Sequence, residues 1–221
     1  MWIIRKNEVN WTFVKIRSKT NPHLFISTKN EKGEWVDEDI SAIEGNITGI
    51  YFKSYTSAET KEEVEVVNIK IKDGDELFIL QSAWTFALRN VVNCILGCGE
   101  ELGRVRIGIY WKINGDKTYP AVAFKNNGQK TNWLLDVGQQ KELTTPITNP
   151  KTGKVQSYDY SDLNEFFKKK LVELNSRLTG ESEDDGLDEF LTAEEAEEKK
   201  KVGVADTIKS RISNTVDDLP F

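Results

Sequence analysis

The sequence is poor in the residue types that most often build metal sites and catalytic centres. Its 221 residues include one histidine, two cysteines and one methionine. The single histidine, His23, has no second ligand at a metal-binding spacing, and no phosphate-cradling glycine loop or Gly-x-Ser-x-Gly elbow is present. No nucleophile, base and orienting residue can be combined into a catalytic set. We therefore expect a protein that is not an enzyme and that binds no metal and no cofactor.

The two cysteines and the apolar segments set further limits. Cys94 and Cys98 have the i, i+4 spacing of one helix face, and a disulfide within a regular helix has poor geometry, so buried, reduced thiols are expected. No apolar run approaches the roughly 18 residues of a membrane span. Residues 1–6 lack the basic-then-apolar order of a signal peptide. The expectation is a soluble, cytoplasmic protein that does not contact a membrane.

Charge is distributed unevenly along the chain. Residues 181–221 hold 13 of the 36 acidic and 5 of the 30 basic residues, so their net charge is −8 and that of residues 1–180 is +2. The hydrophobic fraction of 38% is low for a chain that is globular throughout. We therefore expect a folded domain at residues 1–180, followed by a disordered acidic tail at residues 181–221.

Period-two alternation dominates the first 135 residues and predicts a mainly β domain with helices. Strands are predicted at 11–18, 23–28, 35–36, 47–55, 64–72, 75–81, 104–113 and 119–125, with an edge strand at 133–137. Helices are predicted at 82–97, with Ser82 as the N-cap, and at 159–178, ended by Gly180. Residues 138–157 are expected to form a polar connection.

Three strands, a helix and two strands, from residue 47 to residue 125, follow the element order of the OB-fold, a β-barrel. Residues 1–40 would add an N-terminal hairpin extension, and the helix at 159–178 would pack back on the sheet as a C-terminal helix. An SH3-like barrel or another small mixed β-sheet domain shares much of this pattern. Of these, we expect the OB-fold.

Several predicted strands carry basic and aromatic residues on one face. At residues 104–113, one face is apolar (Val105, Ile107, Ile109, Trp111, Ile113), and Gly108 on the other leaves room for a ligand to approach closely. Cations neutralise phosphates and aromatic rings stack on bases, as single-stranded nucleic acid requires. Ordinary solvated strand faces are the alternative. The candidate nucleic-acid-binding residues are Trp11, Lys15, Arg17, Tyr51, Lys53, Tyr55, Lys70, Lys72, Arg104, Arg106, Tyr110 and Lys112.

The last five residues form a second candidate site, for a protein partner. They are Asp217, Asp218, Leu219, Pro220 and Phe221. The Phe221 ring can fill an apolar pocket while the terminal carboxylate pairs with a basic residue at its rim. Pro220 limits the backbone freedom lost on docking, and the two aspartates can lie along a basic ridge.

This ending resembles the C-terminal tip of bacterial and phage single-stranded DNA-binding proteins. The long body and the helix before the tail are more similar to the larger phage members, which would place the protein in the host cell cytoplasm. The resemblance implies sequence-tolerant binding of single-stranded DNA in replication, recombination and repair, and recruitment of a polymerase, helicase or primase through residues 217–221. Two alternatives remain: a protein–protein adaptor of a replication complex, and an RNA-binding or strand-annealing protein.

Overall fold

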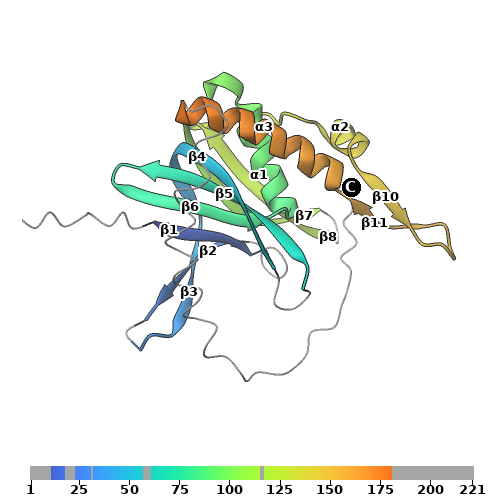
Figure 1. Cartoon of the computed structure of the whole chain (residues 1–221), viewed down its shortest axis with the longest axis horizontal. Coiled ribbons are helices and arrows are strands. Elements are labelled where there is room, and N and C mark those ends of the chain that lie inside the picture. The colour runs from blue at the N-terminus through green and yellow to red at the C-terminus, as the bar shows by residue number, and fades with distance from the viewer. Residues whose placement is uncertain (1–10, 18–22, 31, 57–60, 115–116, 181–221) are drawn as a thin grey trace, which may run out of the picture.

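The computed structural model describes residues 11–17, 23–30, 32–56, 61–114 and 117–180 (Figure 1). The described part is mainly β, with a nine-stranded mixed sheet, a two-stranded sheet and three α-helices, one of them C-terminal. Residues 181–221, with the predicted tail and the partner-binding residues 217–221, lie outside the described residues. None of the described helices is long and apolar enough to span a membrane.

The large sheet confirms the predicted strands, with boundaries shifted by a few residues. Its strands are β1 (Thr12–Arg17), β2 (His23–Lys29), β3 (Trp35–Ile40), β4 (Ile43–Thr56), β5 (Glu63–Asp73), β6 (Glu76–Ala83), β7 (Arg104–Asn114), β8 (Lys117–Asn126) and β9 (Gln129–Lys130). They are arranged in the order β3-β2-β1-β6-β5-β4-β7-β8-β9. The predicted strands at 64–72 and 75–81 form a hairpin, with Asp73 opposite Glu76 across a two-residue turn.

Strand β4 is shared between two neighbours and curves the sheet. Its first residues, from Ile43, pair with β7, and the remainder pairs with β5. Asn46 pairs with both neighbours, and a bulge interrupts the pairing with β5 between Ile47 and Gly49. A bulge bends a strand and increases its twist. Past the bend, the backbone N–H of Ile50 donates to the Asn175 side chain at 2.7 Å. That bond satisfies a donor on the strand edge that β7 has left.

The predicted N-terminal hairpin extension is instead part of the main sheet. β1 and β2 form the expected antiparallel pair, but β1 also runs parallel to β6. A parallel partner joins strands that are distant in sequence, here residue 14 with residue 80. Among the described strands, β6 therefore has β1 and β5 as its neighbours and does not pair with β8.

Both predicted helices are present, and each begins a few residues later than predicted. Helix α1 (Phe86–Gly97) begins after Thr85, whose hydroxyl accepts from Leu88 N at 3.2 Å. The prediction of Ser82 as the N-cap was wrong, because Ser82 lies in β6. Helix α3 (Ser161–Thr179) ends at Gly180 as predicted.

The edge strand predicted at 133–137 is absent from the described structure. Residues 131–136 are an irregular segment, and the short helix α2 (Val137–Glu142) follows it. Asp136 caps this helix and Gln139 completes a reciprocal capping box, which favours helix over strand. The predicted polar connection at 138–157 likewise contains α2 and a hairpin of β10 (Thr145–Thr148) and β11 (Val155–Asp159).

Helices α1 and α3 pack with one face of the sheet to form the core (Figure 1). The largest fully buried side chains come from both layers: Phe167, Leu24, Ile69, Ile71, Leu80, Leu88, Ile95, Ile107, Leu163 and Leu171. Cys94 and Cys98 are buried and free, as predicted. Burial raises the pKa of the Cys94 thiol to about 12, so it stays protonated at neutral pH.

Candidate nucleic-acid interface

The strand register gathers the predicted nucleic-acid-binding residues on the face of the sheet that points away from the core. Residues directly opposite each other, or two apart on one strand, share a face. The linking pairs are Arg104–Asn46, Asn46–Lys72, Lys70–Gly49, Lys70–Ile79 and Ile79–Phe13. This surface is called the outer face below. It carries Lys15, Arg17, Tyr51, Lys53, Tyr55, Lys70, Lys72, Arg104, Arg106, Tyr110 and Lys112.

Two tyrosines present their rings to solvent on the outer face. Tyr55, near the end of β4, is 51% exposed, and Tyr110, on β7, is 47% exposed. Trp11 and Tyr51 are half-buried. Trp35 of β3, which is 58% exposed, shares this face through β2. Tyr55 and Tyr110 are the most accessible of the predicted rings.

The middle of the outer face contains a cation held between two rings. Lys70 Nζ lies 5.8 Å from the centre of the Trp11 ring and 5.4 Å from that of Tyr51. Both distances are within the range of cation–π attraction. This contact brings Trp11, which precedes β1, to the outer face beside β5.

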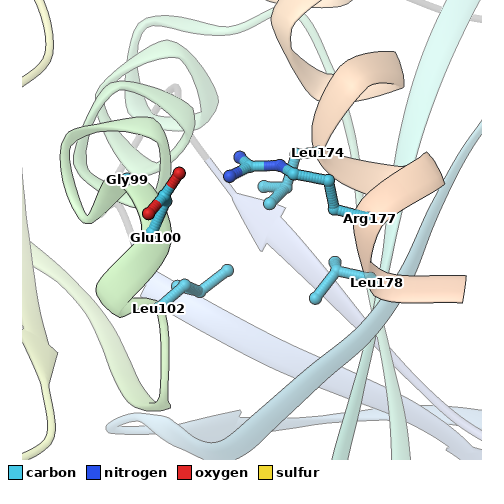
Figure 2. A pocket seen from close by; sticks show the side chains of 6 residues that line it. All are labelled: Gly99, Glu100, Leu102, Leu174, Arg177 and Leu178. Atoms are coloured by element: carbon cyan, nitrogen blue, oxygen red, sulfur yellow. The ribbon is translucent and has the colours of Figure 1, made fainter. Parts of the chain in front are cut away.

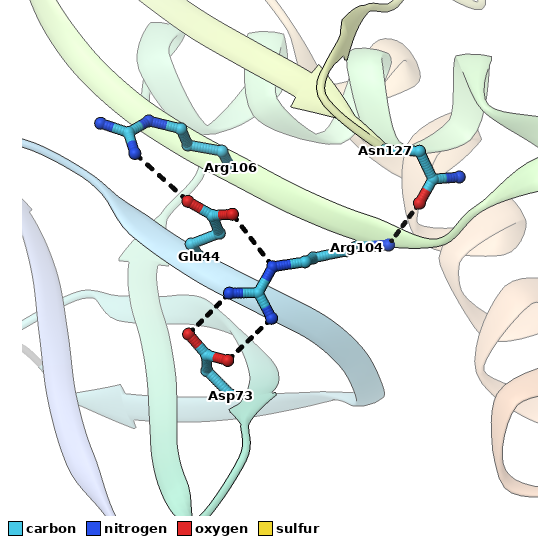
Figure 3. A network of polar contacts seen from close by, with 5 residues as sticks. All are labelled: Glu44, Asp73, Arg104, Arg106 and Asn127. Carbon is cyan, nitrogen blue, oxygen red and sulfur yellow. Dashed lines mark hydrogen bonds and ion pairs between the residues drawn. The ribbon is translucent and has the colours of Figure 1, made fainter.

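The arginines of the outer face are paired with carboxylates of the same chain (Figure 3). Arg104 donates two bonds to Asp73, at 2.7 and 2.8 Å, and a third to Glu44 at 2.9 Å. Arg106 donates to the other oxygen of Glu44 at 3.2 Å. Arg17 is paired with Asp37 at 2.6 Å. All three predicted arginines thus have an internal counter-charge, which the sequence did not indicate.

These contacts keep the two central carboxylates ionised. Hydrogen bonds from Arg104, and then Arg106, hold the pKa of Glu44 below its usual range, and Arg104 does the same to the pKa of Asp73. In return, Asp73 and then Glu44 raise the pKa of Arg104. Because the carboxyl pKa values are lowered, the ion pairs are fully formed at any pH above the ordinary carboxyl pKa. They are lost only when the pH falls through the lowered pKa values.

Lysines provide the uncommitted positive charge. Lys15, Lys72 and Lys112 are exposed and form no ion pair within the described residues. Lys125 shares these properties and lies opposite Arg106 on β8, so it also belongs to the outer face. Lys125 was not among the predicted residues. Its signal was the pairing of the predicted strands at 104–113 and 119–125, which assigns their faces together.

Two predictions for β7 are corrected by the structure. Gly108 does not leave room for a ligand, because a Cβ there would lie 2.9 Å from the backbone oxygen of Ser41, so the space is used by the chain itself. Ile113 was predicted to face the interior but is 74% exposed. It lies at the end of the strand, past the buried residues Val105, Ile107 and Ile109.

A hollow is lined by residues of α3 and of the segment before β7. It has a volume of about 320 Å³ and lies between the last turns of α3 and the segment before β7 (Figure 2). Leu102, Leu174 and Leu178 form its apolar part, with Arg177 and Glu100 at the sides. The described residues contain no group of three or more His, Cys, Asp or Glu side chains arranged to hold a metal ion.

Searches against protein-family models, curated proteins and solved structures found no match to this chain.

Proposed function

We propose that this protein binds single-stranded DNA with little sequence preference in replication, recombination and repair, and recruits replication proteins through residues 217–221. One observation carries the DNA-binding part. The basic and aromatic residues selected from separate strands by alternation alone lie on one continuous face. A basic surface with rings along it is the general solution for single-strand binding.

We also propose that the domain is a variant of the OB-fold. The pairings β4–β5, β5–β6, β4–β7 and β7–β8 match an OB barrel whose strands are β4, β5, β6, β7 and β8. In the variant, β1 lies parallel to β6, on the edge through which the barrel would close. OB-folds bind oligonucleotides on strands two and three and on the loops after strands one and four. Lys70 and Lys72 lie on the second strand, while Tyr55 and Lys112 precede the two loops.

The pairing of the arginines favours a second candidate, the adaptor that tethers replication proteins without binding DNA. Arg104, Arg106 and Arg17 already have carboxylate partners, so part of the positive charge is neutralised. The two functions differ in one measurable property, because only the first includes binding of single strands. An RNA-binding or strand-annealing role would appear in the same titration as preference for RNA or as duplex formation.

A titration of the full chain with fluorescent oligonucleotides tests the proposal. Single-stranded DNA is expected to bind more tightly than duplex DNA of the same length, because stacking needs unpaired bases. If Lys15, Lys72, Lys112 and Lys125 each contact one phosphate, log affinity should fall with log salt with a slope of about −3. Equal affinity for duplex, or the absence of binding at low salt, would contradict the proposal.

Deleting Phe221 is expected to separate the two parts of the function. DNA affinity should remain unchanged, since the ring is proposed to enter an apolar pocket of a partner. Capture of the polymerase, helicase or primase on immobilised protein should be lost. Phe190→Ala is the matched control, since it removes another phenylalanine from residues 181–221, and it should retain capture. Equal loss in both variants would argue against a specific role for the C-terminal residue.

A further inference from the structure

We propose that Glu44 limits the affinity of the outer face for DNA by occupying Arg106 as an internal substitute for phosphate. This inference rests on the proposed function. A carboxylate and a phosphate offer a guanidinium the same pair of acceptor oxygens. Glu44 projects from β4 onto the outer face directly opposite Arg106 of β7, so it lies where the backbone of a bound strand would meet that arginine (Figure 3).

The two arginines are held unequally. Arg104 makes three bonds, two of them bidentate to Asp73, and connects β4, β5 and β7. Bidentate pairing is the stronger and more directional arrangement. Arg106 makes one bond, the 3.2 Å contact with Glu44, and its side chain is 55% exposed. Arg106 is therefore the arginine that can exchange its carboxylate partner for a phosphate. Arg104 keeps its bonds to the neighbouring strands.

Competition at Arg106 affects the strength of DNA binding. A phosphate that reaches Arg106 must displace Glu44, and the displaced carboxylate then lies close to the phosphate with the same sign of charge. Both effects weaken binding without altering the lysines or the tyrosines. Glu44 thus acts as an affinity-determining residue that does not itself bind the strand.

Glu44→Gln tests this directly, since the amide keeps the shape and loses the charge. One additional phosphate contact should steepen the salt slope by about 0.7 and tighten binding about five- to tenfold near 50 mM salt, with little change at 1 M. Asp75→Asn is the matched control. It removes a nearby carboxylate that forms no ion pair within the described residues, and it should leave the slope unchanged.

A double-mutant cycle with Arg106→Gln identifies the route of the effect. If Glu44 acts through Arg106, Glu44→Gln should produce no gain in the Arg106→Gln background. An equal gain in that background, or the same gain from Asp75→Asn, would show a general charge effect and overturn the inference. If Glu44→Gln does not tighten DNA binding at all, the inference is also overturned. The proposed function is not affected in that case, provided that the wild-type protein binds single-stranded DNA. Wild-type protein that binds no single strand overturns both. Thermal melting confirms that each variant is folded.

Discussion

Replacing Tyr55 and Tyr110 together by alanine is expected to weaken binding of single-stranded DNA by at least about thirtyfold. Each ring that stacks on a base contributes roughly 1–3 kcal/mol, so two rings contribute about 2–6 kcal/mol, and 1.4 kcal/mol corresponds to a factor of ten. These two tyrosines are the most exposed of the predicted nucleic-acid-binding rings, at 51% and 47%. The measurement is a titration with an oligonucleotide long enough to span the outer face.

The same exposure predicts that the substitutions leave the fold intact. A side chain half in solvent contributes little to the core, so the melting temperature of the double variant should stay close to that of the wild type. Trp133→Ala is the matched control. Trp133 is 44% exposed but lies in the segment after β9, outside the large sheet, and its loss should spare DNA binding.

An unchanged affinity in the folded double variant would contradict stacking by these rings. Binding would then depend on the basic residues and the remaining rings of the outer face, and the salt slope would report the contribution of the basic residues. Loss of affinity in the Trp133 variant as well would show that the interface is not confined to the outer face. The comparison therefore tests which surface binds, in addition to whether the protein binds at all.

Much of the sheet could be predicted because alternation is a local signal. The strands β4 to β8 and helix α1 can be predicted from residues within each segment. The pairing of β1 with β6 was not found, because parallel neighbours leave no turn between them and the two strands are more than 60 residues apart. Helix α2 was missed because six residues are too few to establish a helical period, although Asp136 and Gln139 carry a capping-box spacing.

In the candidate site, too, local features could be predicted and long-range contacts could not. Alternation predicts which residues share a face on one strand, and the structure brings those faces together. It does not predict that Glu44 and Asp73 lie beside Arg104, since these contacts span 60 and 31 residues. The missing information changes the chemistry of the site, because the arginines expected to bind phosphate are already paired and the lysines carry the uncommitted charge.

Gly97→Ala is expected to destabilise the fold by roughly 2–5 kcal/mol, although alanine is about 1 kcal/mol better than glycine within a helix. Gly97 is the last residue of α1, and the irregular segment after β9 crosses it closely. A Cβ at this position would lie 2.1 Å from the backbone oxygen of Asn132 and 3.0 Å from the nitrogen of Leu134. Atoms cannot approach so closely, so either the helix or the segment must move.

The segment is not free to move, because Asn93 holds it. The fully buried Asn93 side chain donates to Leu135 O and accepts from Leu135 N, both at 2.9 Å, while its backbone oxygen accepts from Leu134 N at 3.1 Å. Displacing the segment breaks these bonds, each with a net contribution of about 1 kcal/mol, and leaves a buried amide unsatisfied at a further cost of roughly 1–3 kcal/mol. This sum exceeds the gain in helix propensity.

Thermal or urea unfolding measures the effect, and Gly138→Ala provides the control. Gly138 is an exposed helical glycine in α2, where the nearest atom to a new Cβ is the carboxylate oxygen of Asp136 at 3.2 Å. This oxygen also caps α2, but it has to give by only a few tenths of an ångström, and alanine gains about 1 kcal/mol in helix propensity. The variant should therefore be close to neutral in stability. If Gly97→Ala proved as stable as Gly138→Ala, the segment could not be held against α1 by Asn93.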